Sequence, residues 1–290
     1  MKNIEKYGKI AGILLSLVYL LFFKENEVFQ WSVFFLILIT IGIPHGALDH
    51  LLMSPKISKT GLMKFILKYL GIIGIYLIIW ILAPTLALIF FLGMSAYHFG
   101  QSHFILHPVY KWKKTTYFLM GTFFLSFILW SDFDSTAKIL ENIVQIDALK
   151  NLGKPFVLVT FILSNILIFK NIPNYWLNFT SEMVILGTML FFLPLLMGFI
   201  IYFGFWHALP SISIEYFSLK DYLGKTKVKN FIKRLMPFTA ASLGGIWMIL
   251  AICYNWMNQE ELVLLFFVLV SLISAPHIWY MNAFLESRKN

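Results

Sequence analysis

The sequence predicts an all-α fold: a polytopic membrane helical bundle with about 8–10 transmembrane helices in a single integral membrane domain, residues 1–290. Of the 290 residues, 59% are hydrophobic and only 13% are charged, whereas a soluble domain carries roughly 25% charged residues. The apolar residues also gather into runs of about 20, which is the length a helix needs to cross a bilayer. We therefore expect a multi-pass protein of the cell membrane.

The first apolar run, residues 10–23, follows a basic start that contains Lys2, Lys6 and Lys9. No small-residue cleavage site follows this run before Lys24, so we expect an uncleaved first helix. Further apolar runs predict spans at 29–53, 61–82, 84–107, 114–131, 153–170, 176–193, 194–213, 232–255 and 260–284. Residues 132–152 are polar and predict an extramembrane or interfacial helix, with Ser135 as its cap.

The run from 176 to 213 is too long for one ordinary helix and contains Pro194 near its middle. The positive-inside rule helps to decide how often it crosses. Basic residues cluster before the first span, after the second and fourth, and in 220–234, and the tail carries Arg288 and Lys289. This pattern predicts both termini inside, and the 220–234 cluster lies inside only if 176–213 crosses twice. Two readings stay open: ten spans, or eight full spans and a re-entrant hairpin broken near Pro194.

The net charge of +9 and the single cysteine exclude several classes of function. In a membrane protein such a charge reports Lys and Arg in cytoplasmic loops, so no nucleic-acid partner is expected. With Cys253 alone, neither an intrachain disulfide nor a cysteine-based metal site is possible.

Histidines lie inside four of the predicted spans: His45, His98, His207 and His277. Ionisable side chains are costly in a bilayer and usually mark functional sites. A lone buried histidine is more often a hydrogen-bonded structural residue than a ligand. With a split at Pro194, however, all four spans run from outside to inside and all four histidines lie at similar depth. Imidazoles that project from several helices build metal sites in bundles, so a shared metal site is the favoured interpretation.

The remaining candidates surround these four ligands. Asp49 lies one turn after His45 and is expected either to orient an imidazole or to pair with a loop lysine. It is also the only good intramembrane carboxylate that we expect. His50 and His103 are expected near the cytoplasmic face, behind the ligands or at the interface, and His107 is expected in solvent. Aromatic residues beside the histidines are expected to wall a ligand cavity: Tyr97, Trp206 and Tyr280.

Neutral imidazoles without thiolates suit Fe(II), Zn(II) or copper. An iron with three or four histidine ligands keeps a position for O₂, and an aromatic, lipid-embedded site suits a lipophilic substrate. The residues alone thus predict an intramembrane histidine–metal enzyme.

Four motifs carry a family resemblance. They are Gly42-Ile43-Pro44-His45-Gly46 with Asp49-His50, Ser95-Ala96-Tyr97-His98-Phe99-Gly100, Phe205-Trp206-His207 and Pro276-His277. In this order and spacing the chain resembles the Brp/Blh family of β-carotene 15,15′-dioxygenases, over nearly its whole length. The Pro-His-Gly-x-x-Asp-His element is fairly specific, whereas Trp-His alone is weak.

The resemblance implies a non-haem Fe(II) membrane enzyme that cleaves the central double bond of β-carotene with O₂ and gives two retinal molecules. It implies His45, His98 and His207 as iron ligands, and a retinal-binding rhodopsin as a user of the product. The family pattern has a second histidine one turn after Trp-His, where this chain has Ser211. Either His277 supplies the fourth imidazole or the site has three histidines; Ser211 itself is expected beside the site.

Three other classes of function remain as alternatives. A diiron lipid hydroxylase or desaturase needs about eight histidines in clustered boxes, whereas this chain has 7 and no adjacent pair. A haem-binding electron carrier needs facing histidine pairs, which the four can supply. A non-catalytic transporter or retinal-protein accessory factor would use the histidines to relay protons or to hold a ligand.

Overall fold

The computed structural model describes residues 1–287, and within this range the regular secondary structure is helical, without a β-strand. The all-α prediction is therefore confirmed. The chain forms two compact units, each made of two segments. The first unit comprises Met1–Leu38 and Ser95–Pro210, and the second comprises Ile39–Met94 and Ser211–Asn290. The grouping into one membrane domain stays a prediction.

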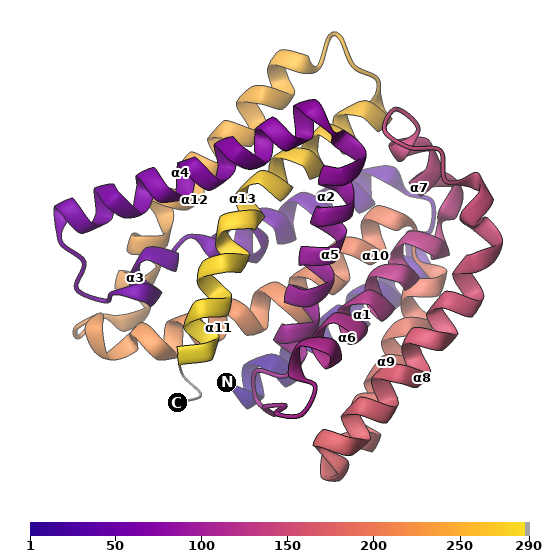
Figure 1. The fold of residues 1–290 in the computed structure, drawn as a ribbon, viewed down its shortest axis with the longest axis horizontal. Helices are drawn as coiled ribbons and strands as arrows, with labels where there is room; N and C mark the ends of the chain where they lie inside the picture. The colour runs from indigo at the N-terminus through magenta and orange to yellow at the C-terminus, as the bar shows by residue number, and fades with distance from the viewer. Residues whose placement is uncertain (288–290) are drawn as a thin grey trace. The chain divides into compact units, whose positions relative to one another are not determined.

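The first unit is built around three helices that pack against one another, α6, α8 and α9. Helices α8 and α9 run side by side in Figure 1. Helix α1 packs against η5 and α9, and α10 packs against α2 and α6. The elements of this unit are the C-terminal part of α5 (Pro84–His103) together with α1 (Lys2–Phe22), α2 (Glu27–Ile37), α6 (Lys113–Ser131), α7 (Phe133–Leu140), η3 (Asp147–Leu152), α8 (Gly153–Asn171), η4 (Pro173–Tyr175), α9 (Trp176–Phe192), α10 (Leu195–Ile201) and the π-helical η5 (Tyr202–Ala208).

The second unit is built around the long helix α13, which packs against α4, α12 and α3. Helix α12 also contacts the short η2 segment. The elements of this unit are the N-terminal part of α5 together with the π-helical η1 (Leu38–Gly42), the 3₁₀ segment η2 (Pro44–Gly46), α3 (Asp49–Met53), α4 (Lys59–Leu82), α11 (Leu209–Leu219), η6 (Lys220–Tyr222), α12 (Lys227–Cys253) and α13 (Gln259–Ser287).

Six stretches of helix among residues 1–287 are long and apolar enough to cross a membrane: Glu27–Met53, Lys59–Leu82, Asp147–Asn171, Leu195–Tyr222, Lys227–Cys253 and Gln259–Ser287. The bent pair α6 and α7 gives a seventh. The chain is thus a multi-pass membrane protein. The number is smaller than the expected 8–10, because α9 has only 17 residues and the first turns of α1 carry several charges. The orientation with both termini inside stays a prediction, and Arg288 and Lys289 lie outside the described residues.

The expected break at Pro194 is confirmed. Helix α9 ends at Phe192, Leu193 is extended, and Pro194 caps the start of α10. Proline disfavours a helical conformation in the residue before it and lacks the N–H that a continuing helix would use. Beyond the break, the helical stretch runs to Tyr222, past the expected end at 213.

The polar stretch 132–152 forms α7 and η3, and α7 turns away from α6 by 91°. The expected cap, Ser135, is wrong. Asp132 is the N-cap residue, and its Oδ1 accepts a hydrogen bond from the Ser135 backbone N–H at 3.3 Å. The other oxygen, Oδ2, accepts from the Leu195 backbone N–H at 3.1 Å. A carboxylate has two oxygens to share, so Asp132 stabilises the beginnings of both α7 and α10.

Two glycines let α5 and α6 approach closely. A Cβ added to Gly100 would lie 1.7 Å from the carbonyl oxygen of Tyr117, and one added to Gly121 would lie 1.8 Å from that of Ala96. Only hydrogen fits at these positions, as in small-residue contacts between membrane helices. His98 lies between Ala96 and Gly100 in sequence, about 200° around the helix from each. The crossing therefore fixes the rotation of α5 that sets the direction of the His98 side chain.

Candidate metal centre

The first unit brings two of the predicted ligands together, His98 of α5 and His207 of η5. Their ring centroids lie 4.6 Å apart with an interplanar angle of 74°. Both side chains are buried. The Phe99 ring lies 4.6 Å and the Phe203 ring 5.6 Å from the His207 ring, so aromatic carbon surrounds this imidazole. A pair of buried imidazoles in apolar surroundings is a donor set suited to a transition metal.

The Ser102 hydroxyl contacts one of the two ring nitrogens of His207. The Ser102 hydroxyl donates to the Phe99 carbonyl oxygen at 2.7 Å and lies 2.8 Å from His207 Nδ1. A hydroxyl has only one proton to donate. Because Ser102 donates that proton to the Phe99 carbonyl oxygen, the Ser102 oxygen accepts a hydrogen bond from His207 Nδ1–H. The lone pair of the neutral ring is then on Nε2. Metal-ligating histidines usually have this kind of partner on the nitrogen that does not bind the metal.

The second unit brings together the other two predicted ligands, His45 of η2 and His277 of α13. Their ring centroids lie 4.7 Å apart at an angle of 90°, and both side chains are buried. Gly46 permits this approach, because a Cβ there would lie 3.0 Å from Nδ1 of His277. The Pro44-His45-Gly46 motif thus places a histidine and leaves space for a second.

The two histidines of this second pair also have partners on Nδ1. His277 Nδ1 lies 3.0 Å from Oδ1 and 3.1 Å from Oδ2 of the buried Asp49 carboxylate. His45 Nδ1 donates to the carbonyl oxygen of Gly42, at the end of the π-helical η1. Each contact places the proton on Nδ1 and leaves the lone pair of the neutral ring on Nε2. Asp49 therefore orients an imidazole in this structure, and the imidazole is that of His277.

Two of the four histidines lie in irregular helix. His207 is in the π-helical η5, and His45 lies in a 3₁₀ turn three residues after the π-helical η1 ends at Gly42. Helices of these types are uncommon, and π-helical turns often occur at functional sites. His98 and His277 lie in regular α-helix, and His277 follows Pro276. The backbone thus departs from a regular α-helix at or next to the Pro-His-Gly and Trp-His motifs.

His103, expected behind the ligands, belongs to a polar network in the first unit. Its Nδ1 lies 3.1 Å from Oε1 of Glu182, and its Nε2 lies 3.1 Å from the hydroxyl of Tyr202. Glu182 Oε2 accepts from Lys9 Nζ at 2.8 Å, and Lys9 also pairs with Glu5. Because protein atoms hold both ring nitrogens, His103 has no nitrogen to offer a metal.

The other expected neighbours pack as follows. In the second unit, the buried His50 ring lies 4.6 Å from the Phe238 ring, and Ser211 is buried in α11. In the first unit, His107 follows α5, and its ring lies 3.9 Å from the Tyr175 ring. His107 is half-buried and therefore less solvated than expected. Burial and the nearby Lys2 charge lower the pKa of His107 below its ordinary value.

The three expected cavity residues each pack on another helix of their own unit. The Tyr97 ring lies 5.9 Å from that of Tyr117, and Trp206 packs on α1, where a Cβ at Gly12 would lie 2.8 Å from its ring. Tyr280 stacks with Tyr69 at 6.2 Å between centroids. Their role in a ligand cavity stays a prediction.

The expectation that Asp49 is the only good intramembrane carboxylate is wrong. Glu215, in α11, is fully buried, and neither carboxylate oxygen has a hydrogen-bond partner among residues 1–287. It was missed because the span was expected to end at 213, whereas α11 continues to Leu219. The available signal was its spacing, since Glu215 lies one helical turn after Ser211 on the same face. Glu182, in α9, differs from Glu215 because it is only part-buried and is paired with Lys9 and His103.

Comparison with known proteins identifies the family. A curated relative from an uncultured marine bacterium, 66A03, is described as a β-carotene 15,15′-dioxygenase and is 37% identical over 79 residues, which are 25% of this chain and 28% of the relative. The match thus spans little more than a quarter of that relative's length. No solved structure matches the chain. The family model described as β-carotene 15,15′-dioxygenase matches residues 36–285, a range that contains His45, His98, His207 and His277. The chain therefore belongs to the β-carotene 15,15′-dioxygenase family.

Proposed function

We propose that this protein cleaves the central double bond of β-carotene with O₂ and releases two molecules of retinal. One carbon–carbon double bond breaks, and each of its two carbons receives one atom of O₂. The observation that carries the proposal is the family match over residues 36–285, which covers most of the chain and every histidine of the two buried pairs.

The proposed cofactor is Fe²⁺, with His45, His98 and His207 as ligands and His277 as the fourth. Support comes from the donor chemistry of each pair. Neutral imidazole suits iron, and a proton fixed on Nδ1 leaves Nε2 as the ligand atom in His45, His207 and His277. When bound, the iron would supply the reactivity toward O₂ that side chains lack.

The chain's own residues orient the ligands and exclude water. Ser102, Asp49 and the Gly42 carbonyl each hold one imidazole in a single tautomer and direction. Phe99 and Phe203 cover the His207 ring with apolar surface, which keeps water away and favours a hydrocarbon substrate. No side-chain general acid or base is required, because the reaction needs no net proton transfer.

The family histidine one turn after Trp-His is replaced by Ser211, so the fourth ligand is the distinctive part of the proposal. His277 is buried, contacts the His45 ring and is oriented by a carboxylate. Those three properties support it as the replacement imidazole. A three-histidine site is the alternative.

The proposed setting is the cell membrane, where β-carotene dissolved in the bilayer reaches the protein directly. A retinal-binding rhodopsin is the proposed user of the product. The six apolar helical stretches support a lipid environment for the enzyme and its substrate.

Expression in cells that accumulate β-carotene tests the function. The proposal predicts loss of the orange colour and formation of retinal, detected by chromatography of cell extracts. A His98→Ala variant present in the membrane at the same level should leave the colour unchanged. Persistent colour with the wild-type protein confirmed in the membrane would overturn the proposal for this substrate.

A further inference from the structure

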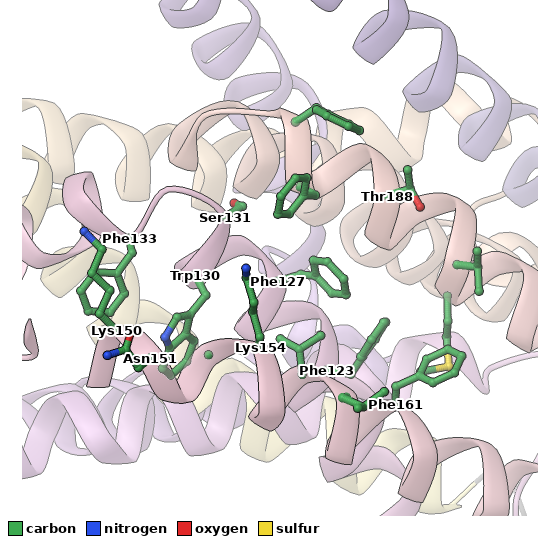
Figure 2. A pocket seen from close by; sticks show the side chains of 17 residues that line it. Phe123, Phe127, Trp130, Ser131, Phe133, Lys150, Asn151, Lys154, Phe161 and Thr188 are labelled. Carbon is green, nitrogen blue, oxygen red and sulfur yellow. The ribbon is translucent and has the colours of Figure 1, made fainter. Parts of the chain in front are cut away.

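A large groove lies in the first unit between α6, α8 and α9, and none of the predicted iron ligands lines it (Figure 2). Its volume is about 810 Å³. Ligand sites in proteins commonly measure about 300–1,000 Å³, so the groove has the size of a binding site.

The body of the groove is aromatic and apolar. Its walls come from the sides of three membrane helices: Phe123, Phe127, Phe161, Met183, Phe191 and Phe192. Figure 2 shows Phe123 and Phe161 projecting toward this apolar part. Walls of this kind suit hydrocarbon chains, which gain dispersion contacts with the rings and expose no polar group.

One end of the groove is polar and cationic. Ser131, Lys150, Asn151 and Lys154 line this end. They lie where α6 ends, where α7 turns away by 91° and where α8 begins. Helix ends and a sharply turned polar helix are expected at the membrane surface, so this end of the groove faces the headgroup region.

The charged residues that line this end are both lysines. Lys150 pairs with Asp134 at 2.6 Å, but both side chains are more than half exposed, at 57% and 84%, so the pair is weak. Lys154 forms no ion pair within residues 1–287, and it lies in the first turn of α8, which contains no acidic residue. The partial positive charge of the α8 N-terminus adds to that of Lys154.

The Trp130 ring packs closely in the wall beside the lysines. The Trp130 indole N–H donates to the Leu149 carbonyl oxygen at 3.3 Å, and the ring lies directly over Gly153, where a Cβ would be 1.9 Å from it. An amphipathic tryptophan at this level is typical of sites where a lipid headgroup meets its chains.

We propose that this groove binds an anionic phospholipid from the bilayer. The acyl chains lie along the aromatic body, and the phosphate group lies at the lysine end, with Lys154 as the principal partner and Lys150 as the second. Charge complementarity decides between the possible occupants. A neutral polyene would fill the apolar body and leave the two lysines without a counter-charge. A phospholipid fills the apolar body with its acyl chains and places its phosphate group beside the lysines.

Native mass spectrometry of the full-length protein in detergent tests the proposal, with phosphatidylglycerol or phosphatidylcholine added at matched concentration. The wild-type protein is expected to retain phosphatidylglycerol at least tenfold better than phosphatidylcholine. A Lys150→Gln/Lys154→Gln double variant is expected to lose that preference. The control is Lys170→Gln, which changes an exposed lysine at the far end of α8 and should leave the lipid preference unchanged.

A Val157→Trp variant fills the apolar body and should release the lipid while both lysines remain. Thermal unfolding of each variant verifies that it is folded. Equal retention of the two lipids by the wild-type protein, or unchanged preference in the double variant, would overturn the proposal. Displacement of the phospholipid by added β-carotene would also overturn it and would assign the groove to a neutral polyene.

Discussion

The Asp49 carboxylate lies 3.0 Å from Nδ1 of His277, and the two residues are 228 positions apart in the sequence. Both side chains are buried in the second unit. A carboxylate that accepts from Nδ1–H makes the imidazole more basic and holds its Nε2 in one direction. The Pro-His-Gly-x-x-Asp segment thus supplies a histidine and, through Asp49, orients another.

Replacement of Asp49 by asparagine should weaken iron binding. The side chain keeps its size but loses its charge and can present an N–H to His277, so the ring loses its orientation and its basicity. We expect a 10- to 100-fold lower affinity, as is usual for partners of metal-ligating histidines. Titration of the apo-protein with Fe²⁺ under anaerobic conditions measures it. The exposed Asp134→Asn is the control, and equal affinities in the two variants would argue against a role for Asp49.

Replacement of Ser102 by alanine should have a similar but smaller effect through His207. The variant removes the oxygen that accepts from His207 Nδ1. A buried ring nitrogen left without its hydrogen-bond partner lowers the free energy of unfolding by about 1–3 kcal/mol. Ser126→Ala is the matched control, because Ser126 is equally buried but donates only to the Thr122 carbonyl of its own helix, at 2.6 Å. If the two variants bind iron equally well, the tautomer assigned to His207 is wrong.

Replacement of Gly100 by alanine should destabilise the protein, because the new methyl group collides with the Tyr117 carbonyl oxygen and separates α5 from α6. Overpacking of this kind costs about 1–3 kcal/mol or more. Gly93→Ala, in the same helix, is the control: a Cβ there meets no atom within 4 Å among the described residues. The control should be neutral or slightly stabilising. Melting temperatures in detergent compare the two, and equal shifts would contradict the close crossing.

Glu182 and Glu215 should respond in opposite ways to neutralisation. Glu182→Gln breaks contacts with Lys9 and His103 and should lower the melting temperature, since broken buried pairs cost about 3–5 kcal/mol. Glu215→Gln removes no hydrogen bond or ion pair among residues 1–287, so the melting temperature should stay the same or rise. Thermal unfolding of both variants tests this contrast. A large destabilisation by Glu215→Gln would mean that this carboxylate has a structural partner.

Hydropathy was sufficient to predict the fold class, because apolar runs of bilayer length leave few alternatives to helices. The break at Pro194 was also predictable, since proline has a fixed backbone effect. Element ends were harder to predict. The helical stretch that begins at Leu195 continues past the expected end at 213, and Glu215 is buried within it. Hydropathy alone did not predict this continuation, because a charged residue usually marks the end of an apolar run.

The histidine pairs were only partly predictable. The four histidines could be identified from the sequence, because an ionisable side chain inside a membrane span is costly and usually functional. They are His45, His98, His207 and His277. Their pairing within each unit depends on helix packing, and so does the partner of Asp49. The sequence did not indicate which imidazole Asp49 would orient, and tertiary packing brings His277 to it. The cap of α7 was equally hard to predict from the sequence. Asp132, not Ser135, is the N-cap residue, and its second carboxylate oxygen contacts the Leu195 backbone N–H of another helix.

Iron content tests the central claim most directly. The wild-type protein and the single variants His45→Ala, His98→Ala, His207→Ala and His277→Ala can be purified in parallel and their folding verified by circular dichroism. Elemental analysis then gives iron per chain. We predict bound iron in the wild type, its loss in the first three variants, and loss or marked weakening in His277→Ala if that residue is the fourth ligand. Unchanged iron content in folded His98→Ala protein would contradict the account.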